Sequence, residues 1–424
     1  MVRGNWCVYG GLLLEGLWMV ELVLAAWGAW VAHFFGRRMA RVAARPLGET
    51  FPRVAVIVPI QGLEAYTATN IQALLAQNYP HYRLIFAVES MADPVCGWLR
   101  KLAATQPAGR VDVVSAGPAQ TRGQKVHNQL AAIARTTAHD EILAFMDADA
   151  KPNPNWLHAL ALPLTYGPHI GAVTGYRYYV PMSEHPANAV ACVMNAMVGS
   201  LLGPYRRTVA WGGTMAIRRS DFFKYGVYDG WQGALSDDYV LSDYVKHKAH
   251  AKIHFVPQCL VASPAWFGWA SLTEFAVRQY RITRVCAGGL WWLALAGVGL
   301  YWFTLLSSAT TALIAGMDGR SWWWRPALVF VALYGLGLIR GVMLRRTGRR
   351  LLPEHWPRIQ RNWFWFTLGL PAVQALTLFF LLRSAFGRRI TWRGIRYEMI
   401  SPTATKVLGR PGMMKGSDQE AARR

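Results

Sequence analysis

The chain has 424 residues, of which 53% are apolar and 16% charged, against about 25% charged residues in an ordinary soluble protein. With 20 tryptophans, this composition favours one catalytic domain joined to membrane helices over several soluble domains. The net charge of +22 does not indicate nucleic-acid binding, because many arginines cluster just outside apolar stretches. The five cysteines show neither a disulfide framework nor the spacing of a zinc site.

The run from Tyr9 to Phe35 is apolar and long enough to cross a bilayer. It has no small-residue cleavage site, so we interpret residues 1–36 as a retained membrane anchor and not as a removed signal peptide. We expect the following segment to lie in the cytoplasm because an arginine cluster follows the anchor: Arg37, Arg38, Arg41 and Arg45.

Residues 53–265 alternate short β-rich runs with helical patterns, which predicts an α/β domain whose mostly parallel sheet is covered on both faces. The predicted strands are Val54–Pro59, Leu84–Val88, Val111–Val114, Ile142–Met146, Ala172–Thr174 and Ile253–Val256. The predicted helices include Thr67–Gln77, Gly123–Arg135 and Pro154–Leu164.

Two further helices are predicted close to the membrane. The apolar run over residues 187–202 is interrupted by asparagines, so it predicts an interfacial or core helix and not a membrane span. Ser271–Arg284 is basic and amphipathic, which is typical of a helix at the membrane surface.

A carboxyl-terminal transmembrane region is predicted over residues 285–400. Its apolar stretches are Val285–Gly316, Pro326–Met343 and Trp363–Leu382. Full crossing by the third stretch would place the basic segment Arg383–Arg396 outside, against the charge rule, so a kinked or re-entrant path stays open. Residues 401–424 are expected to form a disordered tail, most clearly from about Lys406.

The strongest chemical signal is Ile142-Leu-Ala-Phe-Met-Asp-Ala-Asp149, an apolar strand that runs into two carboxylates. In open α/β sheets, ligands bind at the carboxyl ends of the strands. Asp147 and Asp149 could therefore hold a hard divalent cation against a diphosphate, whereas without this context they would be two solvated loop residues.

Two other segments carry candidate groups. Asp237 and Asp238 open a helical pattern; Asp237 suits the N-cap, which leaves Asp238 available as a general base. Arg278 and Arg281 share one face of the basic helix and suit phosphate contacts, or they extend to lipid headgroups. The pair Gly212–Gly213 either lets the backbone approach a ligand or forms a plain turn.

Together these segments resemble family 2-type glycosyltransferases with a GT-A fold, and within them the ceramide glucosyltransferase group and its bacterial relatives. The resemblance covers about Val54 to Met399. It rests on the first strand, on Pro80–Pro94 with its strand and loop, on Gly123–Asn128, and on Thr391-Trp-Arg-Gly-Ile-Arg-Tyr397, which is similar to the tail motif of this group. The fuller Asp-x-Asp is more similar to the bacterial members.

The resemblance implies a role for each candidate. Asp147 and Asp149 would bind Mg²⁺ or Mn²⁺ and the diphosphate, and Asp238 would be the base of an inverting transfer. The leaving diphosphate would be held by Arg278 and Arg281. The nucleotide would be contacted by Lys125 and by the loop Val88–Asp93, in which Ser90 replaces the family's aspartate and Glu89 or Asp93 could substitute for it.

The expected activity is transfer of a sugar from a nucleotide-sugar, in the first place a UDP-hexose, to a lipid hydroxyl at the cytoplasmic face of the cell membrane. The sugar, the lipid and the oligomeric state stay open. One alternative is a processive polysaccharide synthase, disfavoured by the few carboxyl-terminal stretches and by Ile282, which replaces the family's tryptophan. The other is a non-catalytic membrane scaffold.

Overall fold

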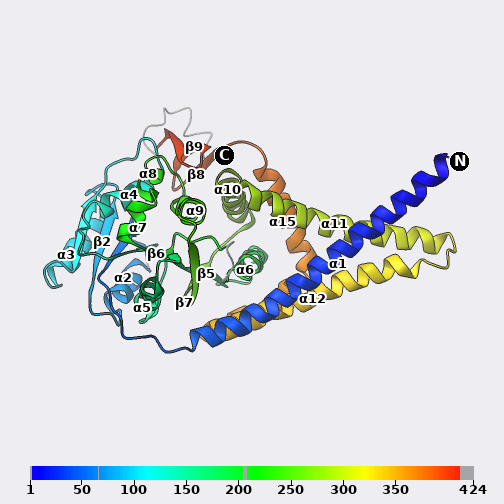
Figure 1. Ribbon diagram of the computed structural model, residues 1–424, viewed down its shortest axis with the longest axis horizontal. Coiled ribbons are helices and arrows are strands. Elements are labelled where there is room, and N and C mark those ends of the chain that lie inside the picture. The colour runs from blue at the N-terminus through cyan, green and yellow to red at the C-terminus, as the bar shows by residue number, and fades with distance from the viewer. Residues whose placement is uncertain (1, 65, 204–207, 411–424) are drawn as a thin grey trace.

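The computed structural model describes residues 2–64, 66–203 and 208–410 of the chain. An α/β domain lies at one end of the molecule and long helices extend from the other (Figure 1). Helix α10 (Trp269–Cys286) lies between the two parts and packs against α6 (Pro186–Gly199), α11 (Gly288–Met317) and α15 (Leu370–Ser384).

The α/β domain is built on a seven-stranded sheet with the order β3-β2-β1-β4-β6-β5-β7. Neighbouring strands are parallel except at β6, which is antiparallel to both β4 and β5. The predicted α/β fold with a mostly parallel sheet is therefore confirmed. The strands are β1 (Val54–Pro59), β2 (Tyr82–Val88), β3 (Val111–Ser115), β4 (Ile142–Met146), β5 (Ile170–Pro181), β6 (Thr214–Arg218) and β7 (Lys252–Ala265).

Helices cover both faces of the sheet, so the central strands are apolar at every position. In β1, Val54, Val56 and Val58 pack on one face, and Ala55 and Ile57 on the other. The first face is covered by α2 (Thr67–Leu75), α3 (Pro94–Ala104) and α5 (Trp156–Ala161), which continues into the 3₁₀ turn Leu162–Tyr166. The second face is covered by α4 (Gln124–Ile133), α7 (Arg219–Lys224), α8 (Val227–Trp231) and α9 (Asp237–Asp243), which continues into the π turn Tyr244–Lys248.

Helix α6, for which the sequence left an interfacial or a core position open, belongs to a core. Its residues Val190 and Val193 are fully buried, in one cluster with Leu272 of α10 and Val373 of α15. This cluster joins the α/β domain to the helices that follow it.

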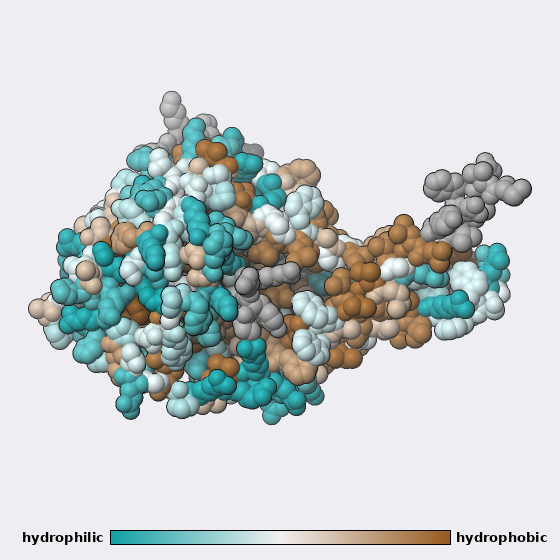
Figure 2. Space-filling view, viewed as in Figure 1, coloured by the Kyte–Doolittle hydropathy of each residue, from teal (hydrophilic) through white to brown (hydrophobic). Residues whose placement is uncertain are grey.

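Three helices are long and apolar enough to cross a membrane among the residues that the structure describes. They are α1 (Val2–Ala43), with its apolar part over Gly11–Ala43, α11 and α12 (Trp324–Leu351). Helix α1 runs along α12, and the exposed surface of this region is largely hydrophobic (Figures 1 and 2). The predicted amino-terminal anchor and the first two carboxyl-terminal stretches are thus long apolar helices.

Of the about three carboxyl-terminal membrane helices that were predicted, two reach the required length among the residues that the structure describes. The third stretch breaks at Thr367 into α14 (Trp363–Phe366) and α15, whose 15 residues fall short of the roughly 20 that a bilayer requires. A 3₁₀ turn (Pro353–His355) and α13 (Trp356–Arg361) connect α12 to this broken segment.

The prediction of a disordered tail from residue 401 is wrong for its first part, while residues 411–424 lie outside the described residues. β8 (Arg389–Trp392), β9 (Ile395–Ser401) and β10 (Ala404–Gly409) form an antiparallel sheet in the order β10-β9-β8. Alternate residues of β9, namely Ile395, Tyr397 and Met399, are buried in one cluster with Leu235 and Ile282. The burial of alternate residues stabilises the strands. The strands were not predicted because charged residues lie between the apolar ones in β9.

Helix α12 approaches the broken segment most closely at Gly341. A Cβ atom there would collide with the carbonyl oxygen of Phe366, at the end of α14, whereas one at Gly335 would meet nothing within 4 Å. Glycine at position 341 therefore allows α14 to lie directly on α12.

We predict that Gly341→Ala destabilises the protein by about 1–3 kcal/mol, because the added methyl forces the two segments apart. Gly335→Ala, on the same helix, should leave stability unchanged or raise it by up to about 1 kcal/mol through helix propensity. The thermal unfolding midpoint of the detergent-solubilised protein measures both, and equal midpoints for the two variants would contradict this packing.

Candidate functional site

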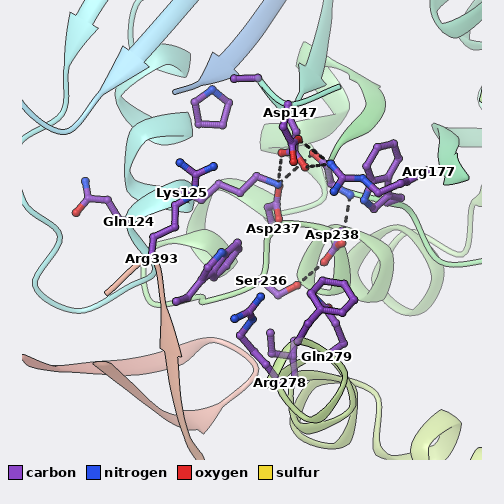
Figure 3. A pocket seen from close by; sticks show the side chains of 18 of the residues that line it. Gln124, Lys125, Asp147, Arg177, Ser236, Asp237, Asp238, Arg278, Gln279 and Arg393 are labelled. Atoms are coloured by element: carbon purple, nitrogen blue, oxygen red, sulfur yellow. Dashed lines mark hydrogen bonds and ion pairs between the residues drawn. The ribbon is translucent and has the colours of Figure 1, made fainter. Parts of the chain in front are cut away.

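A pocket of about 540 Å³ lies at the carboxyl ends of the central strands. One wall follows β1, β2 and β4 and includes Pro59, Glu89 and Asp147, and the opposite wall comes from α6 and α10. Further lining comes from α4, β5, α9, the segment before β6 and the turn between β8 and β9 (Figure 3). The structure thus places a pocket where an open α/β sheet is expected to bind its ligand.

Lys125 joins two acidic segments at the centre of this pocket. Its ammonium lies 2.8 Å from Oδ1 of Asp147 and 3.0 Å from Oδ2 of Asp237, and it donates to the carbonyl oxygen of Gly212 at 3.2 Å (Figure 3). Burial alone would lower the pKa of Lys125, but the carboxylates of Asp147, Asp237 and Asp238 outweigh burial and raise it. The lysine therefore stays charged.

Asp147, the residue directly after β4, remains ionised for the matching reason. Burial would raise its pKa, but the Lys125 ammonium and the Arg177 guanidinium hold it below its ordinary value. A carboxylate that lies between two cations keeps its negative charge in spite of burial.

Arg177 of β5 is a second cation of the site, and the sequence interpretation missed it. It pairs with Asp149 at 2.6 Å, lies 3.8 Å from Oδ2 of Asp147 and covers the ring of Trp211 at 5.1 Å. The available signal was one arginine in the otherwise apolar and aromatic strand Ile170–Pro181, since a charge in a buried strand requires partners.

Asp238 faces the same pocket from the first turn of α9. Its carboxylate accepts hydrogen bonds from the backbone N–H groups of Gly212, at 3.2 Å, and Tyr239, at 2.8 Å, and from the hydroxyl of Ser236. The predicted N-cap was wrong, because Ser236 caps α9 and Asp237 is instead buried against Lys125 and Gln129.

The glycine pair after Trp211 approaches the acidic segment closely. A Cβ at Gly212 would lie 2.6 Å from Oδ2 of Asp237, and Gly213 accepts a hydrogen bond from the backbone N–H of Asp147. The pair therefore positions the carboxylates through the backbone, which is more than a plain turn would do.

The pKa of Asp238 is raised above its ordinary value. Burial is the main cause and the neighbouring Asp237 carboxylate adds to it, while Lys125 and the hydrogen bonds from Ser236 and Gly212 oppose it in part. A carboxylate with a raised pKa accepts a proton more readily than an ordinary one, which suits a general base.

The two acidic candidates that follow β2 behave differently. Glu89 lines the pocket and pairs with Arg410 at 2.5 Å. Asp93 is not among the described residues that line the pocket; it caps α3 by accepting from the N–H of Val95 and also accepts from Gly62. The suggestion that Asp93 contacts the nucleotide is therefore not supported by its position.

The two predicted arginines of α10 are also separated. Arg278 lines the pocket and projects from α10 (Figure 3). Arg281 is not among the described residues that line this pocket; it lines a neighbouring hollow, which Arg278 also lines, and donates to the carbonyl oxygens of Arg389, at 2.7 Å, and Arg383, at 3.4 Å. They diverge because positions i and i+3 of a helix differ by about 60° in direction.

The turn between β8 and β9 supplies a further cation that the sequence interpretation missed. Arg393 and Gly394 both have positive φ, 49° and 78°, which suits a two-residue hairpin turn. Arg393 lines the pocket and donates to the carbonyl oxygen of Gln61 at 3.4 Å, and Tyr397 accepts from the N–H of Gln124. Both residues lie in the tail motif Thr391–Tyr397, which was the signal available.

The donor set fits a divalent cation that is bound together with a diphosphate. The described residues contain no group of three or more His, Cys, Asp or Glu side chains that could hold a metal alone. Asp147 and Asp149 nevertheless offer carboxylate oxygens with 24% and 33% of their side chains exposed to the pocket. Magnesium-type ions typically take one or two carboxylates and complete their shell with water and substrate phosphate.

Comparison with known protein families gives one match over most of the chain. The model of the family described as "Glycosyl transferase family 21" matches residues 16–404. No curated protein sequence matches the chain. A mannosyltransferase from Pyrobaculum calidifontis, solved with GDP-Man and Mn²⁺, is 18% identical over 88% of this chain and 97% of that one, with a TM-score of 0.44. Glucosyl-3-phosphoglycerate synthase from Mycobacterium tuberculosis, solved with Mn²⁺, UDP and glucosyl-3-phosphoglycerate, is 16% identical over 56% of this chain and 80% of that one, with a TM-score of 0.35.

We predict that Lys125→Met lowers the free energy of unfolding by about 3 kcal/mol, because it leaves Asp147 and Asp237 as buried charges without their shared partner. Lys101→Met, on the exposed side of α3, is the matched control and should change little. Thermal unfolding of both variants tests this, and a loss no larger than that of the control would show that Lys125 does not balance the two carboxylates.

Proposed function

The chain belongs to glycosyl transferase family 21, and from that premise we propose that it transfers a sugar from a nucleotide-sugar to the hydroxyl group of a membrane lipid. The observation that carries this proposal is the convergence of Asp147, Asp149 and Asp238 in one pocket beside the membrane-associated helices. The α/β domain would correspond to the GT-A domain of such enzymes and would face the cytoplasm.

The wall formed by α6 and α10 supports a lipid acceptor. Met194 and Val198 of α6 and Leu272 and Phe275 of α10 line the pocket on that side. Helix α10 leads within two residues into α11, which is apolar enough to span a membrane. An apolar wall next to a membrane span offers a path for a hydrocarbon chain, while the opposite polar wall suits a nucleotide-sugar.

The reaction we propose is a single displacement with inversion. Asp238 takes the proton of the acceptor hydroxyl while that oxygen attacks the anomeric carbon. The bond between this carbon and the diphosphate oxygen breaks, and the bond electrons leave with the nucleoside diphosphate. The negative charge of the leaving group is met by Arg278 and Lys125, and Arg393 is positioned to assist them.

A divalent cation completes this proposal, with Asp147 and Asp149 as its protein ligands and Mg²⁺ or Mn²⁺ as candidates. When bound, such an ion neutralises charge on a diphosphate leaving group. Lys125 and Arg177 keep both carboxylates oriented through the ion pairs already described.

For the donor we propose a UDP-hexose, with Glu89 as a candidate contact to the nucleotide. Glu89 follows the carboxyl end of β2, where the resemblance expects an acidic residue, and Arg410 fixes its carboxylate. The test is transfer of label from a UDP-sugar to a lipid extract by the purified protein. Products of one added sugar would support this function, and long polymers would support a polysaccharide synthase instead.

We predict that Asp238→Asn lowers kcat by about 10²–10⁴-fold, the usual contribution of a general base, and leaves donor binding intact. The N–H groups of Gly212 and Tyr239 donate to different oxygens of Asp238, so asparagine keeps an acceptor for one of them but cannot take a proton. Asp229→Asn, exposed in α8, is the control and should keep the wild-type rate. Wild-type turnover by Asp238→Asn would exclude Asp238 as the base.

The raised pKa of Asp238 predicts a pH dependence. A base acts in its ionised form, so kcat/KM should fall as the pH falls through this raised pKa, above the ordinary range of an aspartate. Ser236→Ala removes a hydrogen bond that favours the ionised form, so the acid limb of the profile should move to higher pH. An acid limb that stays in place in this variant would contradict the assignment.

A further inference from the structure

A second hollow, of about 920 Å³, lies on the side of α10 that faces away from the α6 wall. It is bounded by α10, by the carboxyl end of α15 and by β8 and β9. The basic residues that line it are Arg278, Arg281, Arg383, Arg389 and Arg396.

The hollow carries an excess of positive charge. Among the described residues that line it, Glu274 is the one acidic side chain, and it lies 3.8 Å from Arg278. Glu398 pairs with Arg389 from outside the lining, at 3.2 Å. Like charges in one hollow repel each other, so an anion bound there would stabilise the group.

Arg281 is one of the arginines that contribute to this excess. Its terminal nitrogens donate to backbone carbonyl oxygens, which carry no full charge, and its buried Nε has no hydrogen-bond partner among the described residues. Burial lowers the pKa of Arg281, and the neighbouring Arg284 and Arg383 guanidiniums lower it further. No carboxylate in the described part of the chain pairs with Arg281.

The hollow lies next to the start of a membrane span. Arg281 precedes the first residue of α11 by seven positions, about 10 Å at a helical rise. Arg284 donates to the carbonyl oxygen of Ser384 at 2.9 Å, and Trp291 of α11 donates to the Ser384 hydroxyl, so α10, α11 and α15 meet there.

Exposed aromatic rings flank the arginines. Trp269, in the lining, is 43% exposed, and Phe386, in the loop that follows Arg383, is 78% exposed. Aromatic rings beside arginines are typical of the headgroup region of a bilayer, where rings enter the interface and guanidiniums meet phosphates.

We propose that this hollow binds the phosphate group of an anionic phospholipid at a site separate from the acceptor path. The planar guanidinium forks of Arg383, Arg389 and Arg281 suit bidentate contacts with phosphate oxygens. Because Arg278 lines both the hollow and the pocket, a bound headgroup would fix the helix face that contributes to the pocket. The site does not depend on the identity of the sugar or on the transfer step.

The experiment measures lipid retention by the full chain in detergent, by native mass spectrometry, with phosphatidylglycerol and phosphatidylcholine as probes. We expect phosphatidylglycerol to bind and phosphatidylcholine, whose choline is repelled by the arginines, to bind far more weakly. The double variant Arg383→Gln/Arg389→Gln should bind phosphatidylglycerol about tenfold or more weakly, as expected for lost charge-assisted hydrogen bonds.

The control variant is Arg320→Gln. Arg320 is exposed and follows the carboxyl end of α11, so its loss removes one charge outside the hollow and should leave phosphatidylglycerol binding as in the wild type. The side chain of Arg389 is 74% exposed, so the single variant Arg389→Gln should keep its fold and tests the site by itself. Equal binding of both lipids, or an equal loss in Arg320→Gln and Arg389→Gln, would overturn the proposal. Displacement of phosphatidylglycerol by inorganic phosphate at similar concentration would also overturn it, in favour of a site for free phosphate.

Discussion

The ion pairs of Lys125 with Asp147 and Asp237 are the interaction on which the site depends. They join three parts of the chain, namely the end of β4, the first turn of α4 and the first turn of α9. Two carboxylates packed this closely would repel each other and take up a proton in the absence of a cation. The buried ammonium removes that repulsion and so allows acidic residues 90 positions apart in the sequence to face one pocket.

The same charge balance separates the tasks of the four carboxylates. Asp147 and Asp237 share Lys125, and Asp149 pairs with Arg177. Among the described residues, Asp238 has hydrogen-bond donors but no ion pair. Burial therefore raises its pKa while Asp147 stays below its ordinary value. One small group of residues thus contains three carboxylates held in ion pairs and one that suits proton transfer.

Local patterns were sufficient to predict the mostly parallel sheet and to place Asp147 directly after a strand. The apolar run before Asp147 defines a buried strand, and the strand fixes where its end must lie. Arg177 and Arg393 could not be recognised as site residues in the same way, because their place in the site depends on contacts with residues distant in the sequence. Hydropathy alone also overstated the third apolar stretch, which breaks at Thr367; Pro371, in the first turn of α15, has no N–H with which to continue α14.

The antiparallel sheet of β8, β9 and β10 shows why the pocket cannot be assigned to the α/β domain alone. Arg393 and Tyr397 line the pocket, and Arg410 reaches Glu89 and the side chain of Gln124, yet all three follow α11 and α12 in the sequence. Tyr397 is buried in one cluster with Leu235, directly before the Ser236 cap, and with Ile282 of α10. The side of the pocket that Glu89 lines is therefore completed by residues that reach it only after the chain has passed through its long apolar helices. A break in their packing would be transmitted to Glu89 and Asp238 without any change in those residues.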